Sequence, residues 1–447
     1  MVVQHGEEHH IPDKHRVHKP GAWLPADNRV HREYLHRVKK HVDKNPEPLH
    51  PVLQEFKDLI EKTPRIYMYF VQMWQEIPRK PPYCTDPTGA PQVRGYEEML
   101  RLLNHILSRA PEWTDAAESV GMVGVPMCAI FDYAMGTPSG HAAFLDPDVN
   151  RAIKKMLQEW GKYLQSPASA DVLGDHELGW FGKTAVQDLM AVANQPNDSN
   201  MSFEQMYICD PSAKNYGYKS WDDFFTRKLQ ESARPVASPD DDSVIANACE
   251  SAVFNITHNV KLRDEFFNKG QPYSLLDMLG HDPLSKKFVG GSVYQAFLSA
   301  LSYHRWHSPI SGTVRRAFVV EGTYFSEPLG EKNDGSGVVA LNDEGLKGAQ
   351  GYLAALATRA VIIIEADDKD IGLLAFVGIG MDEVSSCDIT IKEGQHIKKG
   401  QETGMFHFGG SSHCLIFQKG VELEGFPEVG RKTNVPVRSH LARVVKK

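Results

Sequence analysis

The chain has 447 residues, which is too many for one hydrophobic core, so we expect two or three domains. Its hydrophobic content of 41% and charged content of 24% are typical of a globular protein. The net charge of -8 argues against a nucleic acid partner, since phosphate binding requires clustered Lys and Arg. The most apolar stretch, residues 121–135, contains Pro126 and Asp132 and is too short to cross a bilayer, so we expect no stable membrane insertion.

Cysteine usage and the first residues bear on the cellular compartment. The six cysteines, at positions 84, 128, 209, 249, 387 and 414, lie far apart and form no Cys-x-x-Cys pair, which favours reduced thiols. The first fifteen residues carry His, Glu and Lys and lack the apolar core of a signal peptide. We therefore expect a cytoplasmic protein.

The N-terminal third of the chain is predicted to be an arm followed by helices. Residues 1–50 are polar and contain histidines at no metal-ligand spacing, which predicts a flexible N-terminal arm rather than a metal-binding tract. Apolar residues then recur at helical spacing, as Leu53, Phe56 and Ile60 do, and this pattern predicts a helical domain over residues 51–215. Such stripes most simply face a core and indicate no chemistry.

A different texture follows the helical stretch. Ser202 with Gln205, and Ser220 with Asp223, have the spacing of capping boxes and predict two short helices. Farther along, short β-rich runs alternate with glycine turns. The strands that we expect there cover residues 313–320, 360–365, 372–378 and 414–418. The predicted fold class is therefore α+β.

Two histidines are candidates for acid–base chemistry. His304 and His307 lie three residues apart in Ser-Tyr-His-Arg-Trp-His-Ser-Pro, residues 302–309. In a strand they would face opposite sides, whereas in a turn or helix they could share one side. Histidine carries protons near neutral pH, and the alternative is a pair of structural histidines beside a proline turn. We expect no metal, because no third and fourth ligand stands at a recognisable spacing.

The most informative element is Gly-Met-Phe-His-Phe-Gly-Gly-Ser-Ser, residues 404–412. Glycine has no Cβ, so it adopts torsions closed to other residues and lets a nucleophile approach closely. The Ser411 hydroxyl could therefore attack the carbonyl carbon of Gly410, which is the first step of self-cleavage. The alternative for this segment is a flexible turn between strands.

The ordered motifs of the second half together resemble the phosphatidylserine decarboxylase family of pyruvoyl enzymes. They are residues 224–229, 233–236, 247–251, 269–275, 302–309 and 404–412. The match covers about residues 216 to 420, and the resemblance implies a catalytic domain over 216–447. The motif sequences, together with the helical N-terminal part, are similar to those of a fungal branch of the family that contains tryptophan decarboxylase.

The resemblance implies that the chain cuts itself between Gly410 and Ser411, and that Ser411 becomes the pyruvoyl group. His307 would be the base that activates Ser411. The family's Asp, which orients that base, falls at Glu250, whose extra methylene requires a shifted backbone. The large and small chains would remain associated.

The resemblance also implies roles in the reaction. The pyruvoyl ketone would form a Schiff base with the substrate amine and accept electrons as CO₂ leaves, so pyridoxal phosphate is not needed. His304 would return the proton to the resulting carbanion. Ser412 stands where the family has Thr, and His413 where relatives have an apolar residue. Both could contact the substrate, although for His413 a core or exposed position is the simpler account.

The function that these features imply is a pyruvoyl-dependent decarboxylase of an aromatic L-amino acid, with tryptophan giving tryptamine. One alternative is a phosphatidylserine decarboxylase, against which stands the expected lack of a membrane anchor. Another alternative is a non-catalytic binding module, because residues 393–400 are similar to the hammerhead of lipoyl carrier domains.

Overall fold

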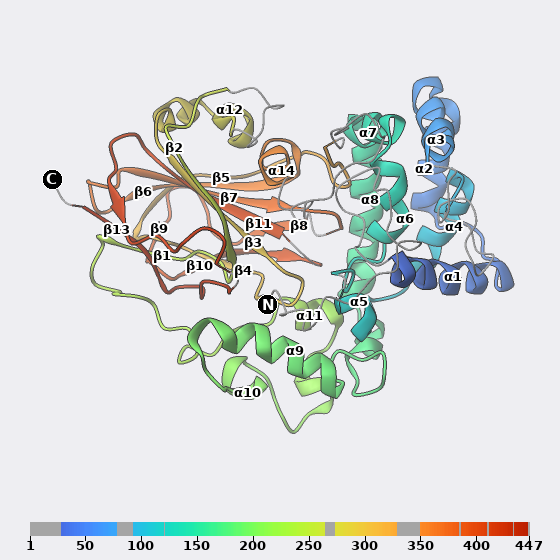
Figure 1. Cartoon of the computed structure of the whole chain (residues 1–447), viewed down its shortest axis with the longest axis horizontal. Helices are drawn as coiled ribbons and strands as arrows, with labels where there is room; N and C mark the ends of the chain where they lie inside the picture. The colour runs from blue at the N-terminus through green and yellow to red at the C-terminus, as the bar shows by residue number, and fades with distance from the viewer. Residues whose placement is uncertain are drawn as a thin grey trace. The chain divides into compact units, whose positions relative to one another are not determined.

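The chain forms two structural units (Figure 1). The computed structural model describes residues 28–77, 93–119, 121–263, 273–328, 349–383, 386–408, 411–431 and 433–445. A helical unit contains the described residues up to Gly182 together with residues 323–328 and Ala349. A sheet-bearing unit contains the described residues of 183–322 and those from Gln350 onward.

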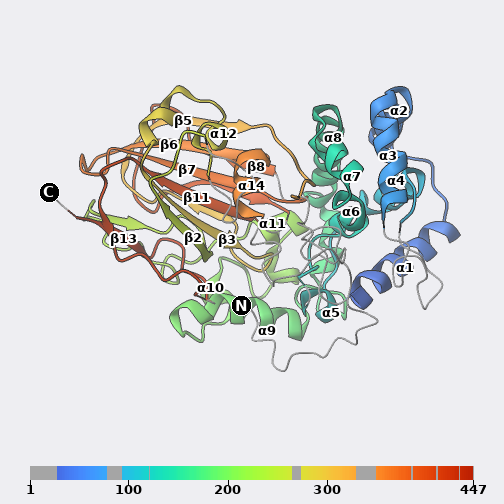
Figure 2. The same ribbon diagram turned by 45° about the horizontal axis from the view of Figure 1, so that its top comes forward.

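Helices build the first unit. They are α1 (Asn28–Lys44), α2 (Pro51–Lys62), α3 (Pro64–Glu76), α4 (Tyr96–Ile106), α5 (Asp115–Ser119), α6 (Cys128–Met135), α7 (Pro138–Leu145) and α8 (Pro147–Leu164). Proline occupies the first turn of α2, α3, α7 and α8, where its fixed φ suits a helix start and its missing N–H would have no partner. Helices α6, α7 and α8 pack side by side (Figure 2).

Helix α1 lies in the segment that was predicted to be a flexible arm. Its Leu35, Val38 and Val42 are buried, so the prediction is wrong for residues 28–44, and residues 1–27 lie outside the described part. The sparse apolar stripe was hidden among charged residues and histidines. Among the described residues, no helix combines the length and apolarity needed to cross a membrane.

The sheet-bearing unit begins with short helices. Its helices are α9 (Lys183–Asn194), α10 (Phe203–Met206), α11 (Trp221–Phe225), α12 (Leu275–Met278) and α14 (Gln350–Leu356). Both predicted caps are confirmed, because Gln205 Oε1 accepts from Ser202 N at 2.8 Å and Ser220 Oγ accepts from Asp223 N at 3.1 Å. Residues 183–215 were predicted to belong to the helical domain, but they belong to this unit.

The described strands form three antiparallel sheets. The strands are β1 (Val244–Ala246), β2 (Ala252–His258), β3 (Ser292–Leu298), β4 (Arg305–His307), β5 (Gly312–Val320), β6 (Arg359–Ala366), β7 (Leu373–Gly380), β8 (Ser386–Ile389), β9 (His396–Ile397), β10 (Glu402–His407), β11 (Ser411–Phe417), β12 (Leu423–Glu424) and β13 (His440–Val444). The largest sheet has the order β2-β3-β11-β7-β6-β5-β9, and the smaller sheets have the orders β4-β10-β8 and β1-β13-β12. The fold class is α+β, as predicted.

The two faces of the largest sheet have different neighbours. On one face, Gln295 of β3 donates a hydrogen bond to Gln350 of α14. On the other face, Gly378 of β7 lies against Trp306 of β4 and Phe406 of β10, and a Cβ added at Gly378 would lie 3.2 Å from each ring. This face and the β4-β10-β8 sheet therefore share an aromatic core.

Candidate active site

Ser411 is the first residue of β11, in the interior of the largest sheet. It pairs with Leu298 of β3 and with Gly380 of β7, and its side chain is fully buried. Its hydroxyl makes no hydrogen bond to any residue that the structure describes. A buried hydroxyl without a partner costs about 1–3 kcal/mol, so such a group is conspicuous. The proposed scissile partner, Gly410, lies outside the described residues.

The strand register shows which face carries the Ser411 side chain. Directly opposite residues of paired strands share a face, and successive residues alternate. Ser411 therefore lies on the same face as His413, which is opposite Gly378 and whose ring centroid is 5.9 Å from that of Phe376. This is the face that Trp306 and Phe406 cover. Ser412 lies on the other face, so Ser411 and Ser412 cannot present their side chains to one side of the sheet.

His413 is buried in the aromatic core. Its ring is 5.9 Å from both the Tyr294 and the Phe376 rings, centroid to centroid. Neither ring nitrogen has a hydrogen-bond partner among the described residues. Burial lowers the pKa of His413 to about 3, so the imidazole is neutral. The core position that the sequence offered as the simpler account is the one observed.

His304 lies in a stack of three rings. Its ring is 4.2 Å from the Phe225 ring with an interplanar angle of 25°, and Phe225 in turn stacks on Trp221 at 5.0 Å. The main-chain oxygen of His304 accepts a hydrogen bond from Phe406 N at 3.0 Å. Helix α11 therefore supports His304 on one side, and β10 fixes its backbone.

His307 is buried, and both of its ring nitrogens have partners. Nδ1 is 2.8 Å from the Gly400 carbonyl oxygen and Nε2 is 2.9 Å from the Tyr303 hydroxyl. Since a carbonyl only accepts, Nδ1 carries the proton and Nε2 accepts from Tyr303. Burial lowers the pKa of His307 to about 4, so it is neutral. A neutral imidazole has the protonation state that a general base requires.

Glu250 is engaged with a partner that the sequence did not suggest. Arg234 binds both of its carboxylate oxygens, with distances of 3.0 Å from Nε and 2.6 Å from Nη2. Burial would lower the pKa of Arg234, but the charge of Glu250 and the hydrogen bonds hold it above the ordinary value. No hydrogen bond joins Glu250 to His307 among the described residues, so a relay from Glu250 through His307 would require Glu250 to exchange partners.

The sequence assigned no role to His407, four residues before Ser411. Its Nδ1 donates to Asp222 Oδ1 at 2.8 Å, and its Nε2 lies 3.9 Å from Asp388 Oδ2. Burial would lower the pKa of His407, but the two carboxylates raise it to about 9, so the imidazole is charged at neutral pH. Asp222 lies just before the 224–229 motif, but its separation from His407 along the chain concealed the contact.

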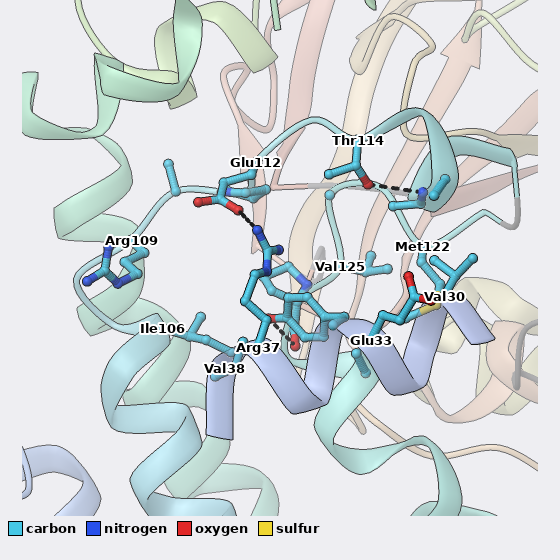
Figure 3. Close-up of a pocket in the computed structure, with 18 of the residues that line it drawn as sticks. Val30, Glu33, Arg37, Val38, Ile106, Arg109, Glu112, Thr114, Met122 and Val125 are labelled. Atoms are coloured by element: carbon cyan, nitrogen blue, oxygen red, sulfur yellow. Dashed lines mark hydrogen bonds and ion pairs between the residues drawn. The ribbon is translucent and has the colours of Figure 1, made fainter. Parts of the chain in front are cut away.

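A cavity of about 450 Å³ lies in the helical unit (Figure 3). Apolar side chains such as Val30, Ile106 and Val125 line it, and Arg37 donates to Glu112 across it at 2.9 Å. The predicted catalytic residues are not among the described residues that line this cavity. Within the described chain, no group of three or more His, Cys, Asp or Glu side chains is arranged to hold a metal ion.

Comparison with known proteins identifies the family of this chain. Two family models, both described as phosphatidylserine decarboxylase, match residues 50–189 and 221–438. The decarboxylase iboD of Amanita muscaria is 46% identical over 72% of this chain and 92% of that protein. The L-tryptophan decarboxylase of Psilocybe cubensis is 33% identical over 90% of this chain and 89% of its own length. A phosphatidylserine decarboxylase proenzyme of Chlamydia trachomatis is 31% identical over 51% of this chain and 71% of its own length.

The chain belongs to the phosphatidylserine decarboxylase family. It is a decarboxylase, and the alternative of a non-catalytic lipoyl-like module is set aside.

Proposed function

We propose that this protein is a self-processing, pyruvoyl-dependent decarboxylase of an aromatic L-amino acid, with L-tryptophan converted to tryptamine. The observation that carries the proposal is Ser411, a buried hydroxyl without a hydrogen-bond partner among the described residues, at the start of a strand beside an aromatic core. Membership in a family whose relatives include proenzymes supports self-processing. The name of the Psilocybe relative supports tryptophan.

Maturation begins at the Ser411 hydroxyl. Its oxygen attacks the Gly410 carbonyl carbon, the amide C–N bond breaks, and an ester forms as the hydroxyl proton passes to the Ser411 nitrogen. Elimination then releases the Gly410 carboxylate and leaves dehydroalanine, and addition of water with loss of ammonia gives the pyruvoyl group. We assign His307 as the base. This role requires His307 Nε2 to release the Tyr303 hydroxyl. It also requires the side chain to turn toward Ser411, since His307 follows Trp306 in β4 and alternation directs it away from the layer that Trp306 faces.

Decarboxylation takes place in the layer between the sheets. The pyruvoyl group derived from Ser411 supplies a ketone that condenses with the substrate amine and a carbonyl that withdraws electrons as CO₂ leaves. We assign to His304 the return of a proton to the substrate carbon. The rings of Trp306, Phe376 and Phe406 exclude water from this layer, and their apolar surface favours an aromatic side chain.

The two chains remain associated after the cut. All seven residues of β11 belong to the small chain, and each pairs with both β3 and β7 of the large chain. Separating the chains would expose every backbone group of a buried strand. We place the enzyme in the cytosol, because the six widely spaced cysteines, with no Cys-x-x-Cys pair, favour reduced thiols.

Purified protein incubated with L-tryptophan, L-tyrosine, L-phenylalanine and phosphatidylserine vesicles tests the proposal, with the amine product and CO₂ measured for each. An intact mass spectrum recorded beforehand reports self-cleavage. We expect two chains and the highest kcat/KM for tryptophan. An uncut, active protein would refute the pyruvoyl mechanism. Phosphatidylethanolamine as the principal product would identify the second candidate, which the names of the two family models favour.

A further inference from the structure

Helix α11 is too short to be stable alone and depends on contacts at both ends. Near its N-terminus, Asp222 accepts the hydrogen bond from His407 of β10. At its C-terminus, the main-chain oxygen of Thr226 accepts from Arg305 Nε of β4 at 2.6 Å. The β4-β10-β8 sheet, in which β4 begins directly after His304, thus holds the helix through two charged side chains.

The same helix supplies the ring that stacks on His304. Phe225 lies three residues after Asp222, on the neighbouring turn, and its ring is 4.2 Å from that of His304. On the other side, Phe406, which precedes His407, donates its main-chain N–H to the His304 carbonyl oxygen. The contact between Asp222 and His407 therefore links the two elements that hold His304. Helix α11 contacts its side chain through Phe225, and β10 contacts its backbone through Phe406.

Two carboxylates face His407, and a separate ion pair lies on the neighbouring strands. Asp222 faces it from α11 and Asp388 from β8. On β4, Arg305 is paired with Glu402 of β10 at 2.8 Å. Among the described residues, His407 is the cation that forms an ion pair with each of the two aspartates. Its side chain is only 15% exposed. An ion pair this well covered is weakly screened by salt.

We propose that the ion pair between Asp222 and His407 positions His304 for proton return during decarboxylation, by holding Phe225 against the His304 ring. This inference rests on the proposed function. Asp222 and His407 act through Phe225, so they are positioning residues. They should affect the chemical step rather than substrate binding, and a displacement of about 1 Å in a reacting group can cost on the order of 100-fold in rate.

Asp222→Asn tests the inference, because the amide keeps the shape but loses the charge. Asp223→Asn is the matched control on the same helix, since Asp223 is exposed and its carboxylate accepts only from Lys219 N among the described residues. We expect Asp222→Asn to be cut like the wild type, to keep KM within about twofold, and to lose about 10- to 100-fold in kcat. The control should match the wild type.

The pH profile of kcat, recorded on protein shown to be folded at each pH, provides a readout that a loss of stability would not move. The wild-type kcat should fall as the pH rises through about 9, where His407 loses its proton. In Asp222→Asn this alkaline limb should move down by about one pH unit, because one of the two carboxylates that favour the proton is gone. An unchanged kcat and an unchanged alkaline limb would each overturn the inference.

A double-mutant cycle with Phe225→Leu tests the route through the ring. If Asp222 acts by placing Phe225, the kcat losses of the two variants should be far from additive. Additive losses overturn the route. An uncut Asp222→Asn chain assigns the pair to maturation and also overturns the inference. If the wild type itself is uncut, the proposed function fails instead, so the two failures are distinct.

Discussion

The main-chain N–H of Val437 donates a hydrogen bond of 2.8 Å to the Glu250 carboxylate, and the two residues lie on opposite sides of the proposed cleavage point. Arg234 binds the same carboxylate in a buried ion pair. After self-cleavage, Glu250 would belong to the large chain and Val437 to the small chain. Glu250 therefore has a structural task at the junction of the two chains, whatever part it takes in maturation.

Glu250→Gln should lower the free energy of unfolding by about 3–5 kcal/mol, because it leaves the buried Arg234 charge without its partner. Urea unfolding measures this when both proteins also carry Ser411→Ala, so that each unfolds as a single uncut chain. Glu231→Gln is the control, since Glu231 is 86% exposed in its pair with Arg438 and should change stability by less than about 1 kcal/mol.

The same variant tests the predicted relay from Glu250 to His307. If Glu250 orients that base, Glu250→Gln should slow cutting even at temperatures where the protein is fully folded. Because cutting happens once per molecule, its rate should be followed from the first translated protein. A folded Glu250→Gln chain that matures at the wild-type rate would show that Glu250 is not part of the relay.

Ser411→Ala should give one uncut, inactive chain, because it removes the attacking oxygen and the precursor of the pyruvoyl group. Ser412→Ala should still be cut, since Ser412 lies on the other face of β11. Intact mass spectrometry distinguishes these products, and the small chain should begin at position 411 with a pyruvoyl in place of serine. A normally cut Ser411→Ala protein would contradict the assignment. Loss of activity in a cut Ser412→Ala protein would restore Ser412 as a substrate contact.

His307→Ala should block maturation, because a serine hydroxyl is a weak nucleophile without a base. His304→Ala should be cut but should decarboxylate about 10²- to 10⁴-fold more slowly, as is typical when one acid–base group is lost. Gel analysis of processing and an assay of CO₂ release separate the two effects. The opposite pattern, an uncut His304→Ala and a mature His307→Ala, would reverse the roles.

The stability of the enzyme should depend on pH through His407. Its pKa is raised from 6.5 to about 9 in the folded protein, so its contribution is complete below pH 6.5 and is lost as the pH rises through 9. The shift corresponds to a contribution on the order of 3 kcal/mol. Unfolding free energies at pH 6 and pH 9.5 should therefore differ less for His407→Gln than for the wild type. His396→Gln, which alters an exposed pair with Asp367, should behave like the wild type.

Local sequence patterns predicted the positions of the strands well but not the residue at which β11 begins. The run 313–320 became β5 (Gly312–Val320) and 360–365 became β6 (Arg359–Ala366), because alternation and β-branched residues depend only on neighbours. The strand predicted at 414–418 begins earlier, at Ser411 itself. The prediction did not extend the strand into a Gly-Gly-Ser-Ser segment that is typical of a turn.

Long-range partners account for what the sequence could not predict in the site. Arg234 and Glu250 stand in separate motifs, and their order along the chain does not show that Glu250 binds Arg234 rather than His307. His407 and Asp222 are 185 residues apart, so only the folded chain reveals the pair. The helical domain predicted over residues 51–215 likewise included residues 183–194, which form α9, because the sequence does not show that this helix belongs to the sheet-bearing unit.

The position of β11 between β3 and β7 gives the proposed cleavage a consequence for unfolding. Before cleavage, an unfolded molecule can regain its sheet by a unimolecular reaction. Afterwards the strand belongs to a separate chain, so refolding depends on protein concentration and must restore two molecules to one sheet. Cleavage would thereby give the mature enzyme a lifetime limited by its first unfolding event, and a cell would replace such molecules by new synthesis rather than by repair.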